Sequence, residues 1–189
     1  SAKSESTFAL FGHSRLETHG YSGSSENNQP VVLGNWVVVH NGVITNAEEI
    51  RSEVEIDDLG IETDSAAIAL LLEEWDRKGR QCTSDEVFGR LSGEYSIIAA
   101  SSSGEIFCRT NVGNLYLATG DSRQTNIGSE PRQFSKELQD NCSKVPLNET
   151  VIFRVSSAGR GNLSVSTSSK SEIGMEGAQG FKKIYSFKT

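Results

Sequence analysis

The residues best suited to chemistry are His40, Asn41 and Gly42, which follow the apolar run Trp36 to Val39. A side-chain amide beside a glycine N–H provides two donors for one developing negative charge, as in an oxyanion hole. Because glycine has no Cβ, a substrate can approach its backbone closely. Asn-Gly after a strand is also a common turn. The pair by itself therefore allows two interpretations, a turn or an oxyanion hole.

Two charged residues have a similar choice of roles. Arg15 follows a short apolar run and precedes a loop, and Asp64 lies where a helix is expected to begin. A guanidinium can hold a carboxylate with two hydrogen bonds, although Arg15 could also be an ordinary surface residue. Asp64 could bind an ammonium group or only favour the positive end of the helix. Together they could hold the two charges of an α-amino acid, with Asn41 and Gly42 at its reactive end.

The histidines and cysteines do not suggest a metal site. The three histidines, at 13, 19 and 40, form no HxxxH or HExxH pattern. Each could be a structural histidine. The cysteines at 82, 108 and 142 form no CxxC pair, which disfavours both zinc and a disulfide framework. No metal and no cofactor are expected, and free thiols fit a reducing cytoplasm.

Length and charge narrow the class of protein. The 189 residues are enough for one domain, so a single domain over residues 1–189 is expected. A net charge of −7 disfavours nucleic acid as a partner, since phosphates would be repelled. The sequence has no apolar run long enough to span a bilayer and no signal-peptide pattern. These features predict a cytoplasmic protein that binds no membrane.

Hydrophobic periodicity and turn residues predict an α+β fold with more strands than helices. The expected strands are 8–11, 31–33, 36–39, 95–100, 105–109, 115–119, 126–129, 151–155, 163–167 and 181–187, with turns at 34–35 and 159–161. The strand at 151–155 is expected to be an edge or half-buried strand. Helices are expected at 47–53 after the N-cap Asn46, from Thr63 to Gly79, after a capping box of Thr83 and Glu86, and over 131–140. Sheets covered by helices would accommodate this order.

Three motifs occur in a recognisable order. They are His13-x-Arg15-x-x-Thr18-His19-Gly20, Val39-His40-Asn41-Gly42-x-Ile44 and Thr63-Asp64-x-x-x-Ile68, and Gly93-x-Tyr95 follows them. In this order they resemble the class II, or N-terminal nucleophile type, glutamine amidotransferases, and most of all the glutaminase domain of glucosamine-6-phosphate synthase. The resemblance covers nearly the whole chain and is clearest over residues 8–100.

The resemblance implies a fold, a reaction and a set of roles. The fold would be the four-layer αββα sandwich of the N-terminal nucleophile hydrolases. Arg15 would bind the α-carboxylate of L-glutamine and Asp64 its α-ammonium, while Thr18 and His19 would line the pocket. Asn41 and Gly42 would form the oxyanion hole. A thiolate would attack the side-chain amide and release ammonia, and water would then hydrolyse the thioester. A synthase or isomerase domain or subunit would accept the ammonia, and a homo-oligomer is left open.

One part of the family pattern is missing from the sequence. The family reaction begins at an N-terminal cysteine on a first strand, but only twelve residues precede His13 and none is cysteine. Ser1 is a poor substitute, because the polar run Ser1 to Ser6 does not suit a buried central strand. We expect that the nucleophile and its strand lie outside these residues, and that the domain hydrolyses glutamine. The alternative is a glutamine-binding, scaffold or regulatory domain that has no nucleophile.

Overall fold

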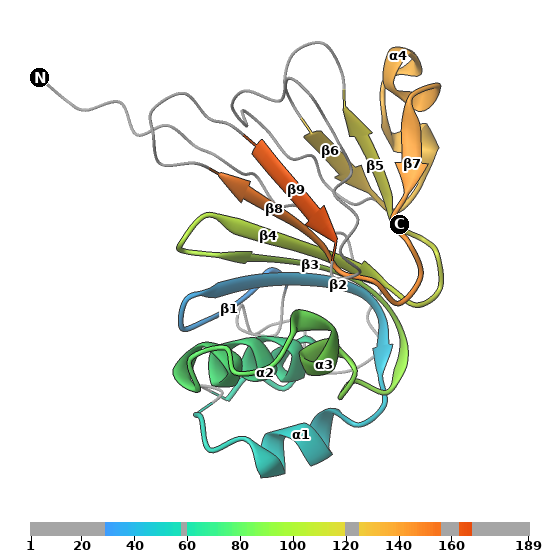
Figure 1. Ribbon diagram of the computed structural model, residues 1–189. Helices are drawn as coiled ribbons and strands as arrows, with labels where there is room; N and C mark the ends of the chain where they lie inside the picture. Colours follow the sequence, from blue (N-terminus) through green and yellow to red (C-terminus); the bar gives the residue numbers. More distant parts are fainter. Residues whose placement is uncertain (1–28, 58–59, 120–124, 156–162, 168–189) are drawn as a thin grey trace, which may run out of the picture.

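The computed structural model describes residues 29–57, 60–119, 125–155 and 163–167, with backbone only for residues 155 and 163–167. In this part of the chain, helices cover one face of a large sheet, and a smaller sheet lies against its other face (Figure 1). This arrangement is an α+β sandwich, which confirms the fold class predicted from the periodicity. Arg15, Thr18 and His19 lie outside the described residues, as do the strands expected at 8–11 and 181–187 and the turn at 159–161.

The large sheet is antiparallel throughout and has the order β1-β2-β3-β4-β8-β9. Its strands are β1 (Val31–Leu33), β2 (Trp36–Ile44), β3 (Gly93–Ser101), β4 (Glu105–Thr110), β8 (Val151–Val155) and β9 (Leu163–Thr167). β2 pairs with β3 along its full length, from Trp36 opposite Ser101 to Ile44 opposite Gly93. β1 is much shorter and pairs only with the first residues of β2. The second half of β2 therefore extends beyond its neighbour on that side.

The smaller sheet has the order β6-β5-β7, from β5 (Tyr116–Thr119), β6 (Thr125–Gly128) and β7 (Cys142–Lys144). Apolar side chains from the two sheets meet in one core cluster, which includes Val39, Ile98, Leu117, Ile127 and Phe153. Burial of these apolar side chains between the facing sides of the two sheets holds the sheets together.

Three helices cover the other face of the large sheet: α1 (Ala47–Glu53), α2 (Ser65–Arg77) and α3 (Ser84–Phe88). α2 is buried along most of its length, and Phe107 of β4 packs edge-on against both Trp36 and Trp75 (ring centroids 5.3 and 6.0 Å apart). The three aromatic rings join α2 to the middle of the sheet. The capping box of Thr83 and Glu86 at the start of α3 is confirmed.

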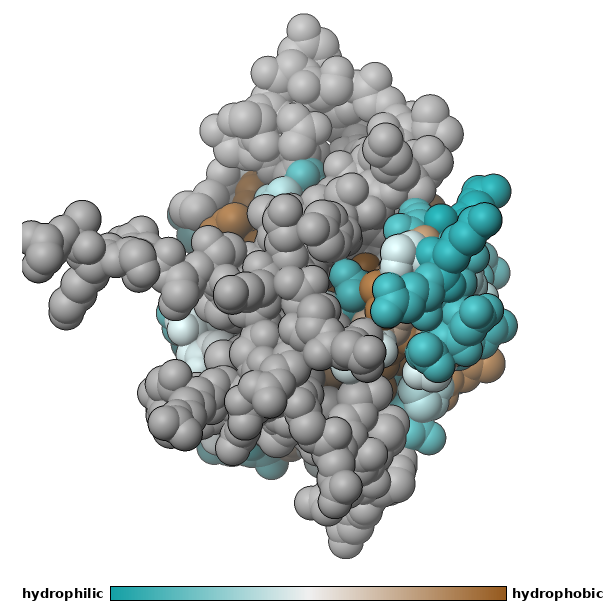
Figure 2. Space-filling view, turned by 90° about the horizontal axis from the view of Figure 1, so that it is seen from above, coloured by the Kyte–Doolittle hydropathy of each residue, from teal (hydrophilic) through white to brown (hydrophobic). Residues whose placement is uncertain are grey.

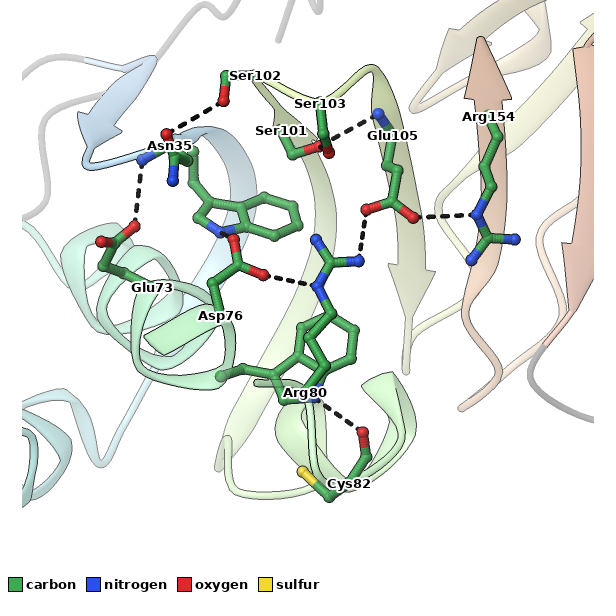
Figure 3. A network of polar contacts seen from close by, with 12 residues as sticks. Asn35, Glu73, Asp76, Arg80, Cys82, Ser101, Ser102, Ser103, Glu105 and Arg154 are labelled. Carbon is green, nitrogen blue, oxygen red and sulfur yellow. Dashed lines mark hydrogen bonds and ion pairs between the residues drawn. The ribbon is translucent and has the colours of Figure 1, made fainter. Parts of the chain in front are cut away.

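A polar network fixes the last turns of α2 against the sheet (Figure 3). Asp76 accepts hydrogen bonds from Trp36 Nε1 (2.9 Å) and Arg80 Nε (2.6 Å). Arg80 also donates to Glu105 of β4 (2.5 Å), which accepts a second bond from Arg154 of β8 (3.0 Å). The charges alternate in sign along this chain of contacts, so each partly buried group has a partner. The network makes α2 a rigid support for the residues at its other end.

The remaining local differences from the sequence predictions have physical reasons. The helix predicted over 131–140 is wrong as one element, because the backbone is extended at Phe134 and Ser135. It forms a 3₁₀ turn, η2 (Pro131–Gln133), and a short helix, α4 (Lys136–Gln139). β8 is not the predicted edge or half-buried strand: it lies between β4 and β9, and Val151 to Phe153 are buried. β7 was not predicted, since three residues carry too little periodicity.

The outer surface near α4 and β7 is hydrophilic in the view from above (Figure 2). α4 has no buried residue, and Ser143 and Lys144 of β7 are exposed. This side of the described structure therefore faces solvent. Among the residues that the structure describes, no helix has both the length and the apolar character needed to cross a bilayer.

Candidate functional site

Asn41 and Gly42 lie inside a strand. β2 continues through both residues to Ile44, with Asn41 opposite Ser96 and Gly42 opposite Tyr95 of β3. This pairing excludes the interpretation of Asn-Gly as a hairpin turn. Asn41, Gly42 and Val43 are exposed, whereas the flanking His40 and Ile44 are buried. The strand therefore presents a short accessible stretch between two anchored residues.

Glycine is required at position 42 by the backbone. Its φ is +124°, and a Cβ added there would lie 2.0 Å from the carbonyl oxygen of Glu94 on β3. Gly93, at the start of β3, has the same constraint, because its Cβ would lie 2.1 Å from the carbonyl oxygen of Val43. The two glycines allow β2 and β3 to approach closely where the site lies. Gly42 therefore has a structural reason to be present, whatever its chemistry.

The outer edge of β2 is capped on both sides of Gly42. The side-chain amide of Gln29 accepts from the backbone N–H of His40 (2.6 Å) and donates to its carbonyl (2.8 Å), as a neighbouring strand would. Four residues further along β2, the N–H of Ile44 donates to Asp64 Oδ2 (2.8 Å). Alternate residues of an antiparallel strand direct their N–H groups to the same edge. We infer that the N–H of Gly42 faces this edge as well, between the Gln29 amide and the Asp64 carboxylate.

Asp64 is the N-cap residue of α2, but its side chain does not cap the helix. The sequence predicted Thr63 as the cap; the structure places Asp64 there, with no hydrogen bond from its side chain to the helix. Asp64 instead accepts from Ile44, and its other oxygen, Oδ1, lies 3.9 Å from His40 Nδ1. The side chain is 32% exposed, so it remains accessible to a ligand. The Asp64 side chain therefore bonds to β2 and not to its own helix.

Next to Asp64 is a cavity of about 310 Å³. Val43 and Ile44 of β2 form part of its wall, and three carboxylates, of Glu48, Glu62 and Asp64, are among the other lining residues. No lysine or arginine is among its described lining residues. A site with this charge favours a cation over an anion.

The structure brings together the sequence-predicted residues that it describes. Asn41 and Gly42 lie at the second half of β2, and Asp64 bonds to the same half of that strand. The sequence reasoning missed Gln29, whose position in a polar loop gives no signal, and Ser65, whose hydroxyl lies 3.0 Å from His40 Nδ1. In the described part of the chain, no three His, Cys, Asp or Glu side chains are grouped so that they could hold a metal ion.

Comparison with known proteins decides the family. Residues 13–136, well over half of the chain, match the family described as a glutamine amidotransferase domain. The chain belongs to this family. The predicted resemblance is therefore confirmed, and the matched range includes all six proposed site residues.

Similar curated proteins are glutamine–fructose-6-phosphate aminotransferases (isomerizing). The protein from Bradyrhizobium diazoefficiens is 40% identical over 73 residues, which cover 38% of this chain and 12% of that protein. The protein from Geobacillus kaustophilus is 34% identical over 119 residues, which cover 58% of this chain and 19% of that protein. The matched part of the chain thus spans under one fifth of the length of these relatives.

Solved structures support the fold. The glutamine phosphoribosylpyrophosphate amidotransferase from B. subtilis, complexed with ADP and GMP, aligns with a TM-score of 0.52 at 17% identity, over 83% of this chain and 34% of that one. A structure described as the allosteric regulatory enzyme of purine biosynthesis aligns with a TM-score of 0.52 at 18% identity, over 82% and 33%. At this identity the likeness concerns the fold, an α+β sandwich.

Proposed function

We propose that this domain hydrolyses the side-chain amide of L-glutamine to glutamate and ammonia. Asp64 would bind the α-ammonium and Arg15 the α-carboxylate, while Thr18 and His19 would line the pocket. Asn41 and the N–H of Gly42 would donate to the oxyanion that forms at the amide carbon. The observation that carries the proposal is the second half of β2, where an exposed Asn-Gly pair lies beside a carboxylate fixed to the same strand.

The chemistry requires a nucleophile, and the described cysteines do not fit that role. Cys142 is on β7 of the small sheet, which lies on the opposite face of the large sheet from α2. Cys108 is buried, and burial raises the pKa of its thiol, so its thiolate is disfavoured. Cys82 is exposed but follows the C-terminal end of α2, whereas Asp64 lies at its N-terminal end. We infer that a thiolate from outside the described residues attacks the amide carbon. The amide nitrogen would leave as ammonia after protonation, and water would cleave the thioester.

The ammonia would pass to an acceptor on a synthase or isomerase domain or subunit. The relatives from Bradyrhizobium and Geobacillus are named for the transfer of nitrogen from glutamine to fructose 6-phosphate, and they are much longer than the matched region. Their names support a division of labour between glutamine hydrolysis and an acceptor site. The proposal includes a cytoplasmic location, which three free cysteines support. Whether the protein forms a homo-oligomer is a question for a measurement of its mass in solution.

The proposed fold is the complete four-layer αββα sandwich. Helices α1 to α3, the large sheet and the small sheet account for three of its layers. α4 lies beside the small sheet and would belong, together with η2, to the fourth layer (Figure 1). A crystal structure of the complete protein tests this assignment, which fails if the small sheet has no helical cover.

A second candidate is a domain that binds glutamine without hydrolysing it, as a scaffold or regulatory module. One observation favours it: the contact with Glu94 requires Gly42 in the fold, so this glycine would persist in a domain without chemistry. Calorimetric titration with glutamine and an assay of ammonia release, both on the complete protein, separate the two. We expect saturable binding together with ammonia release. Binding with no release would support the second candidate. The absence of both binding and release would reject both candidates.

A further inference from the structure

His40 is a buried polar side chain that the roles above leave unused. Only 1% of its side chain is exposed, and it belongs to the same face of β2 as Trp36 and Val38, which pack against the helices. Burying an imidazole among apolar neighbours is costly unless its nitrogens have partners. An apolar residue would fill such a position at lower cost. The contacts of His40 are therefore a reason for its presence.

Those contacts lead to the start of α2. Nδ1 of His40 lies 3.0 Å from the hydroxyl of Ser65, which is itself fully buried, and 3.9 Å from Oδ1 of Asp64. The backbone of His40 is held in turn by both atoms of the Gln29 amide. The imidazole is thus a fixed point from which the first residues of α2 can be placed.

We propose that His40 is a positioning residue, which acts through Ser65 to hold the Asp64 carboxylate where it receives the substrate ammonium. This inference rests on the proposed glutamine site. The Asp64 carboxylate accepts from the N–H of Ile44, and the next residue in the chain, Ser65, is anchored by His40. Because His40 and Ile44 both belong to β2, the strand that carries Asn41 and Gly42 also sets the position of Asp64.

The consequence is a fixed spacing between the two ends of the substrate. The ammonium site and the oxyanion donors are both positioned by one five-residue stretch of backbone, from His40 to Ile44. Such an arrangement keeps binding and reacting groups in register, which a catalytic site needs to within a fraction of an ångström. If the contact between His40 and Ser65 is lost, the first residues of α2 lose an anchor, and Asp64, which is one-third exposed, can turn toward solvent.

Two substitutions of His40 separate positioning from packing. The side-chain amide of Asn lies near the place of Nδ1, whereas that of Gln reaches toward the place of Nε2, and both remove the ring. In the complete protein, we expect His40→Gln to raise the KM for glutamine about tenfold, the effect of losing one hydrogen bond that supports a charged group. Its kcat should change by less than about twofold. His40→Asn should recover most of the wild-type KM.

Ser65 provides an independent pair that disturbs the core less. Ser65→Ala should reproduce the rise in KM, and Ser65→Thr, which keeps the hydroxyl, should not. Thermal melting of all four variants shows whether each one is folded. The proposal is overturned if His40→Gln and His40→Asn alter KM equally, if Ser65→Ala leaves KM unchanged, or if kcat falls while KM does not move.

Failure of this inference can be told from failure of the proposed function. A wild-type protein that binds and hydrolyses glutamine, with variants of unchanged KM, would reject only the role of His40. A wild-type protein that shows no heat of glutamine binding and no ammonia release would reject the glutamine site, and the role of His40 with it.

Discussion

Replacing Gly42 by alanine should destabilise the protein through one identified contact. The added methyl would lie 2.0 Å from the carbonyl oxygen of Glu94, where ordinary contacts are 3.4–4 Å, so β2 and β3 must move apart. Forcing extra atoms into a packed site costs about 1–3 kcal/mol. The positive φ of +124° adds conformational strain of about 1–3 kcal/mol for a residue with a Cβ. The expected total loss in free energy of unfolding is therefore about 2–6 kcal/mol.

The matched control is Gly79→Ala. Gly79 also has a positive φ, of +70°, but a Cβ there would meet nothing within 4 Å. Its substitution should cost only the conformational strain of about 1–3 kcal/mol. Urea unfolding of the two variants, followed by circular dichroism, gives the difference directly. The reasoning is refuted if Gly42→Ala is no less stable than Gly79→Ala, because the overlap with Glu94 would then have no energetic effect.

Three further outcomes follow from the packing, the thiols and the helix cap. Phe107→Ala should lower the free energy of unfolding by about 3–5 kcal/mol, because it leaves a cavity between Trp36 and Trp75. A loss under about 1 kcal/mol in urea unfolding would contradict this packing. In labelling with a thiol reagent, exposed Cys82 should react in the folded protein, whereas Cys108, with the pKa of its thiol raised by burial, should react only on unfolding. Hydrogen bonds from Thr83 lower the pKa of Glu86 below its ordinary value of 4.5. The stabilisation that Glu86 gives is therefore full above about pH 4.5 and is lost as the pH falls through its lower pKa in the folded protein. The difference in melting temperature between wild type and Glu86→Gln should shrink on acidification. A difference that grows on acidification would contradict this role of Glu86.

The sequence was most informative where local signals agree with the fold. The boundaries of α1, β8 and β9 match the predicted ranges, because apolar periodicity and turn residues define them locally. The capping box at Thr83 is likewise a local feature with a specific spacing. The Asn46 position was also correct, although its side chain bonds to the backbone of Ser92 and Arg90 rather than to its own helix.

The sequence was less informative where partners are distant along the chain. The Asn-Gly pair has a strong local turn propensity, but full pairing with β3 keeps Gly42 in the strand. Asp64 looked like part of a helix start, whereas its bond goes to Ile44, twenty residues earlier. The Gln29 clamp on His40 uses a side chain that lies just before β1, and a polar loop residue gives no local signal of such a partner. The motifs therefore led to Asn41, Gly42 and Asp64 as proposed site residues, and tertiary contacts determine how these residues are held.

The account depends most on Asn41 as a donor to the developing oxyanion. The direct test is the kcat for ammonia release from glutamine by the complete protein, compared between Asn41→Ala and Asn46→Ala. Asn46 is a suitable control because its side chain makes two structural hydrogen bonds, to Arg90 and Ser92, and lies on the segment that follows β2. The account predicts that kcat falls by about 10²–10³ for Asn41→Ala and stays near wild type for Asn46→Ala. An unchanged kcat for Asn41→Ala, or an equal loss in both variants, would contradict it.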